Sequence, residues 1–246
     1  MTVKFKTGDV KTLAESVQEA AGLLGQLILS NSGAVNELAD LMDAKVVPSN
    51  EVQNFISQTI PDYPGGTERA FFQKLLAIHL EASSQPWETV LADLTEACFQ
   101  QLLERKYKSV TNIDIARVVS IRVEIEGKSA DTGDKNFDVV AWNKPVGQGE
   151  ALEVKKQIRS LNSQPASKKI KAIIKFRQDL IACTGRTSFI GLASLRDQSK
   201  HSAIEIIKAL IGLDESQGLN LDFLVRGEFA SWMRTSYVGV DLNSSA

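Results

Sequence analysis

The 246-residue sequence predicts an α/β (α+β) protein in which a helical N-terminal region precedes a mixed sheet flanked by helices. Two observations lead to this prediction. Apolar residues recur every three or four positions through roughly the first hundred residues, as in amphipathic helices. Near residue 110 the pattern changes to alternation of apolar and polar residues, and strands then alternate with helices towards the C-terminus.

Five helices are predicted before the first strand, the second of them capped by Asn31 or Ser32. The stretch PDYPGG at 61–66 is a predicted loop, because two prolines and two glycines disfavour any regular element. We expect the helices within residues 10–29, 32–42, 49–60, 67–82 and 86–107.

The second part of the sequence has the order β-β-β-α-β-α-β. The turn-rich segment NKPVGQG joins the second and third strands as a hairpin-like connection. The strand TSFIGLASL is largely apolar, which is typical of a strand buried on both faces. Strands are expected within 115–127, 137–142, 151–156, 187–195 and 219–227, and helices within 167–183 and 201–213.

Composition excludes several classes of protein. The longest apolar runs fall short of a membrane span, and the first residues lack the apolar core of a secretory signal, so we expect no membrane association and a cytoplasmic location. Cys98 and Cys183 both lie in apolar patterns and are predicted to be buried free thiols. Two histidines and two cysteines argue against a zinc site. The sequence contains neither GxxxxGK nor GxGxxG, which disfavours the common nucleotide-binding enzymes.

Charge is unevenly distributed along the chain, although the net charge is only −2. Residues 153–177 carry eight Lys or Arg against one acid, whereas the first sixty residues carry four lysines against seven acids. A local basic face can bind a phosphate backbone even when the whole protein is slightly acidic. The candidates for such contacts are Lys156, Arg159, Ser160, Lys168 and Lys169.

One group of charges has a spacing that suggests chemistry. Asp138 opens one predicted strand, and fifteen residues later Glu153, Lys155 and Gln157 share one face of the next strand. An antiparallel return would bring the two carboxylates together, where they repel each other and favour a hard cation such as Mg²⁺ or Mn²⁺. A nearby lysine can hold the attacking water. The alternative is that these are ordinary charges on the solvated face of two strands.

These residues resemble the motif of the PD-(D/E)xK nuclease superfamily, whose members have a restriction-endonuclease-like fold. Asp138 followed by Glu153-Val154-Lys155 matches the motif, with Phe137 in place of its proline. The resemblance covers roughly residues 87–230. It implies that Asp138, Glu153 and the Val154 carbonyl bind the metal, that Lys155 serves the nucleophilic water, and that Gln157 assists. It also implies a glutamate on the preceding helix, either Glu96 or its rival Glu68.

The resemblance implies an Mg²⁺-dependent endonuclease of the type II restriction or anti-phage kind, acting on DNA that we expect to be double-stranded. We expect a nuclease core at 87–246 and a helical region at 1–86 that serves recognition, dimerisation or response to a partner. Cutting both strands favours a homodimer. Two alternatives stay open: a non-catalytic DNA-binding or assembly subunit on the same fold, and RNA as the substrate.

Overall fold

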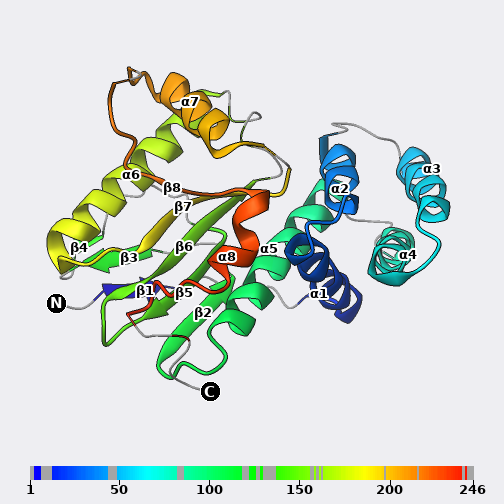
Figure 1. Ribbon diagram of the computed structural model, residues 1–246, viewed down its shortest axis with the longest axis horizontal. Coiled ribbons are helices and arrows are strands. Elements are labelled where there is room, and N and C mark those ends of the chain that lie inside the picture. Colours follow the sequence, from blue (N-terminus) through cyan, green and yellow to red (C-terminus); the bar gives the residue numbers. More distant parts are fainter. Residues whose placement is uncertain are drawn as a thin grey trace. The chain divides into compact units, whose positions relative to one another are not determined.

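A computed structural model gives the fold of the chain (Figure 1). It describes residues 3–6, 13–43, 49–81, 86–117, 122–125, 128–129, 137–155, 158, 161, 163–196, 198–214, 216–239 and 242. The chain divides into two compact units, Lys11–Leu102 and Met1–Val10 with Leu103–Ala246. The functional division of the chain after residue 86 remains a prediction.

The first unit is helical, as the spacing of apolar residues predicted. The buried face of its first helix carries Val17, Ala20, Leu24 and Leu27, which recur at three- and four-residue intervals. The predicted loop at 61–66 begins with a short 3₁₀ turn, η1, at Ile60–Asp62. The helices are α1 Glu15–Leu29, α2 Ala34–Asp43, α3 Ser49–Thr59, α4 Gly66–Glu81 and α5 Trp87–Lys106, whose last turn enters the second unit.

The second unit is built on a five-stranded mixed sheet of order β2-β5-β6-β7-β8. The pairs β2–β5 and β5–β6 are antiparallel, whereas the pairs β6–β7 and β7–β8 are parallel. Parallel neighbours require crossover connections, and two helices, α6 Gln164–Thr184 and α7 Lys200–Ile211, supply them. The strands are β2 Ile113–Arg117, β5 Val139–Asn143, β6 Gln148–Lys155, β7 Phe189–Ser194 and β8 Asp222–Leu224.

Local sequence sets the ends of both crossover helices. The hydroxyl oxygen of Ser163 accepts a hydrogen bond from the Ala166 N–H at 3.3 Å and caps the start of α6, and Ser199 caps α7 in the same way. Each helix ends at a glycine in the left-handed conformation, Gly185 with φ 63° and Gly212 with φ 75°. The Ser163 cap thus begins α6 soon after β6 ends at Lys155.

The predicted single strand at 115–127 is wrong, because the structure divides it between two sheets. Its first residues belong to β2, and its later residues form β3 Arg122–Ile125. The strand β3 lies in a separate sheet of order β1-β3-β4, with β1 at Val3–Lys6 and β4 at Lys128–Ser129. Alternation of apolar and polar residues continues across the division, so the sequence pattern does not mark it.

Both faces of the five-stranded sheet are covered. Ala151, Val140 and Trp142 belong to a buried apolar cluster with residues of α6 and α7, such as Ile173 and Ile207. The opposite face meets the short helix α8, Phe229–Trp232, which follows a 3₁₀ turn, η3, at Arg226–Glu228 (Figure 1). None of the helices in the described ranges combines the length and the apolar character needed to cross a bilayer.

Candidate active site

The structure places Asp138 and Glu153 side by side. Val139 pairs with Leu152 in the antiparallel register of β5 and β6, so Asp138, immediately before β5, stands opposite Glu153. Residues directly opposite in an antiparallel pair project from the same face of the sheet. Here that face is the one covered by α6 and α7, because Asp138 shares it with Val140 and Trp142.

Two backbone contacts hold Asp138 in place. Its N–H donates to the Leu152 carbonyl at 2.9 Å, and its Oδ2 accepts a hydrogen bond from the Val154 N–H at 2.6 Å. Burial, followed by repulsion from Glu153, raises the pKa of Asp138 from 3.8 to about 6, although Lys155 and Lys169 act in the opposite direction. The two carboxylates therefore repel each other, and keeping Asp138 ionised beside Glu153 lowers the stability of the folded state.

Glu153 is almost completely buried, with 1% of its side chain exposed, and two lysines neutralise it. The Lys155 ammonium pairs with Oε1, and the Lys169 ammonium, which comes from α6, pairs with Oε2. Among the described residues, no other group donates a hydrogen bond to these oxygens. The alternative of a solvated strand face is wrong for Glu153, because α6 covers this side of β6.

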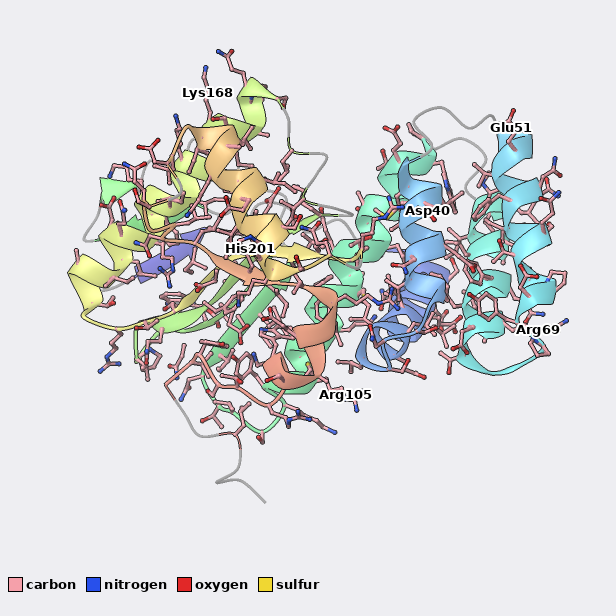
Figure 2. All side chains as sticks on the ribbon, turned by 45° about the horizontal axis from the view of Figure 1, so that its top comes forward. Asp40, Glu51, Arg69, Arg105, Lys168 and His201 are labelled. Carbon is pink, nitrogen blue, oxygen red and sulfur yellow. The ribbon has the colours of Figure 1, made fainter. Side chains whose placement is uncertain are left out.

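The remaining predicted site residues are distributed as follows. Within an extended strand the N–H and the C=O of one residue face the same neighbour, so the Val154 carbonyl is directed to the side where Asp138 lies. Lys168 is exposed, and its side chain projects outward near the start of α6 (Figure 2). Gln157, Lys156, Arg159 and Ser160 lie outside the described residues.

The two candidate helix glutamates belong to the helical unit. Glu96 lies on α5, and Glu68 lies on α4, where its Oε1 accepts a hydrogen bond from the Ser32 hydroxyl at 3.0 Å. A role for either residue beside Asp138 stays a prediction.

The donor set fits a hard divalent cation. Asp138 and Glu153 offer carboxylate oxygens, and Val154 offers a carbonyl oxygen, which are the ligand types that Mg²⁺ and Mn²⁺ prefer. The described residues contain no group of three His, Cys, Asp or Glu placed to share one ion. Mg²⁺ is often held by one or two carboxylates, with water and substrate phosphate completing its shell, so two acids are enough.

A second buried charge pair, which the sequence analysis did not single out, lies on the other face of β6. We call it the Glu150 cluster: Glu150, Lys106, Tyr107 and Trp232. The Lys106 ammonium lies 2.5 Å from Glu150 Oε1, Tyr107 donates to the same oxygen, and the Trp232 N–H donates to Oε2 at 2.5 Å. The ammonium also lies 4.2 Å from the centre of the Trp232 ring, a cation–π contact.

Burial controls the ionisation of this cluster. Both charged side chains are fully inaccessible to solvent. Burial lowers the pKa of Lys106 to about 8 even though Glu150 acts to raise it, and burial raises the pKa of Glu150. A signal for the cluster existed in the sequence, since alternation along β6 places Glu150 on the same face as the apolar Leu152 and Val154.

Comparisons with known proteins leave the family of the chain open. No protein-family model and no curated protein sequence matches the chain. Among solved structures, the crystal structure of protein VC1899 from Vibrio cholerae aligns with a TM-score of 0.48 at 12% identity. The alignment covers 94% of this chain and 57% of that protein, so the chain spans little more than half the length of the protein it matches.

Proposed function

We propose that the chain is an Mg²⁺-dependent endonuclease of the PD-(D/E)xK superfamily that hydrolyses DNA phosphodiester bonds. The observation that carries this proposal is the placement of Asp138, Glu153 and Lys155 on one face of two adjacent strands, where a half-buried Asp138 lies beside a buried Glu153. A restriction or anti-phage role, a cytoplasmic location and a homodimer that cuts both strands belong to the same proposal.

Each residue of the site has a role in this chemistry. Bound Mg²⁺ or Mn²⁺ would lower the pKa of a coordinated water and offset charge on the phosphoryl oxygens. Asp138 and Glu153 supply the carboxylates that would hold the ion. Before it binds, backbone contacts hold Asp138 and two lysine ion pairs hold Glu153. Lys155, whose side chain is 27% exposed, can turn from Glu153 towards a water and orient it for attack.

The basic surface of α6 would hold the DNA backbone. Lys168, Lys171 and Lys175 are exposed on this helix, which begins soon after the β6 end that carries Glu153. Lysine side chains contact phosphates without reading bases, so this surface supports binding but not sequence selection.

A second candidate function is a DNA-binding or assembly subunit without catalysis. One observation favours it: Lys155 and Lys169 already neutralise Glu153, so the acidic pair does not depend on a metal for charge balance. In such a subunit the four charges would serve only to hold α6 on the sheet.

Plasmid cleavage separates the two functions. Supercoiled DNA is incubated with the wild type, Glu153→Gln, Lys155→Ala and Lys144→Ala in Mg²⁺, Mn²⁺ or EDTA. Lys144 is a matched control, since it lies in the turn at the other end of the β5–β6 hairpin, where it pairs with Asp114. We expect metal-dependent nicking by the wild type and Lys144→Ala only. Equal cutting by the wild type and Lys155→Ala would show that the proposed site is wrong.

A further inference from the structure

We infer that Lys169 is an internal counter-ion that occupies the metal-binding carboxylate Glu153 and exchanges with the metal. This inference rests on the proposed function and deepens it by adding a residue from outside the three-residue motif. Lys169 was expected on the DNA-binding surface, but the structure turns its side chain inward. Its ammonium pairs with Glu153 Oε2, and only 18% of the side chain is exposed.

A divalent metal ion and the Lys169 ammonium would compete for the same carboxylate oxygen, Glu153 Oε2. Glu153 has two carboxylate oxygens, and an ammonium group lies on each of them. Because the carboxylate is 1% exposed, solvent cannot take the place of either partner. A divalent ion that binds Glu153 together with Asp138 must therefore displace at least one lysine.

Of the two lysines, Lys169 is the one that we expect a metal ion to displace from Glu153. Lys155 and Glu153 lie on the same face of one strand, two residues apart, so their side chains remain neighbours even if α6 moves. Lys169 reaches Glu153 from a separate helix, and its neighbours Lys168 and Lys171 are exposed. Once displaced, its ammonium would still lie beside the ion and the scissile phosphate, where it can bind a phosphoryl oxygen.

Lys169 would then have opposite effects on the two steps. In the absence of substrate it opposes metal binding, because the ion must replace an existing ion pair. During hydrolysis it contributes positive charge beside the reacting phosphate. A residue that only held α6 on the sheet would produce neither effect.

The test measures Mn²⁺ binding without DNA, from the electron paramagnetic resonance signal of free Mn²⁺, beside single-turnover cleavage. The variants are Lys169→Met, Lys169→Gln and the exposed control Lys144→Met, each checked for an unchanged melting temperature. We expect both Lys169 variants to bind Mn²⁺ about tenfold more tightly than the wild type and to cut at least about tenfold more slowly, as removal of a charge-assisted phosphate contact should cause. The control should bind Mn²⁺ as the wild type does.

The outcomes separate this inference from the proposed function. Equal Mn²⁺ affinity in the wild type and both Lys169 variants would overturn the inference and leave the nuclease proposal standing. Binding by the variants but not by the wild type would support the inference and identify Lys169 as a block on the metal site. Absence of binding in all of the proteins would overturn both.

Discussion

Replacing Asp138 by asparagine should stabilise the protein at neutral pH, although it removes a proposed metal ligand. Burial and repulsion from Glu153 raise the pKa of Asp138 from 3.8 to about 6. At 1.36 kcal/mol for each pKa step of one, keeping this carboxylate ionised costs the folded state at most about 3 kcal/mol. Partial contact with solvent reduces the expected gain to about 1–2 kcal/mol. Asparagine keeps the shape and can still accept the Val154 N–H.

The pH dependence of this effect has a defined sign. Between pH 3.8 and about 6 the folded state binds more protons at Asp138 than the unfolded state, so the wild type loses stability as the pH rises through this window. The Asp138→Asn variant lacks that loss. Its advantage over the wild type should therefore grow across the window and reach its full value above about pH 6.

Urea unfolding, followed by near-ultraviolet circular dichroism at three pH values spanning the window, measures the effect. Asp114→Asn is the control for the loss of one carboxylate outside the site, because Asp114 is an exposed acid on β2 that pairs with Lys144. Adding Mg²⁺ should stabilise the wild type and not Asp138→Asn. A variant less stable than the wild type above pH 6, or an advantage that does not change with pH, would refute the reasoning.

Three further predictions concern other parts of the second unit. Lys106→Met should lower the free energy of unfolding by about 3–5 kcal/mol, because it leaves the buried Glu150 carboxylate without its counter-ion. The double variant Lys106→Met/Glu150→Leu should recover most of this loss in a urea-unfolding double-mutant cycle. Gly191→Ala should prevent a folded core, since a Cβ there would lie 1.9 Å from the Asp222 carbonyl oxygen; a variant with the wild-type melting temperature would contradict this. Lys168→Ala should reduce the salt slope of DNA binding by about one, as read from fluorescence anisotropy at several salt concentrations.

The pairing of Asp138 with Glu153 could be predicted because it depends on local geometry alone. A short turn joins two strands, and the two-residue period of each strand then determines which side chains meet. The helices were predictable for the same reason, since the three- and four-residue spacing of Val17, Ala20 and Leu24 defines a buried face within one helix.

Features that depend on distant segments could not be predicted. Glu153 is buried because α6, a separate element, covers that face of β6. Lys169 lies on α6, the helix that connects β6 to β7, and no periodic pattern in the sequence relates its position to that of Glu153. The Glu150 cluster joins the end of α5 to β6 and α8. Its contacts link residues far apart in the sequence, since Lys106 lies 44 residues before Glu150 and Trp232 lies 82 residues after it. Side-chain alternation indicated that Glu150 faced inward, but not which partners it would meet.

The strand β6 carries two buried acids, Glu150 and Glu153, that belong to different networks on opposite faces of the sheet. Three steps along a strand always reverse the face, so one inserted or deleted residue between them would send one acid into the network of the other. The segment between the two acids should therefore tolerate no change of length. In homologous chains we expect insertions and deletions to collect in the turn at 144–147 and to be absent from 150–153, which an alignment of such chains can check directly.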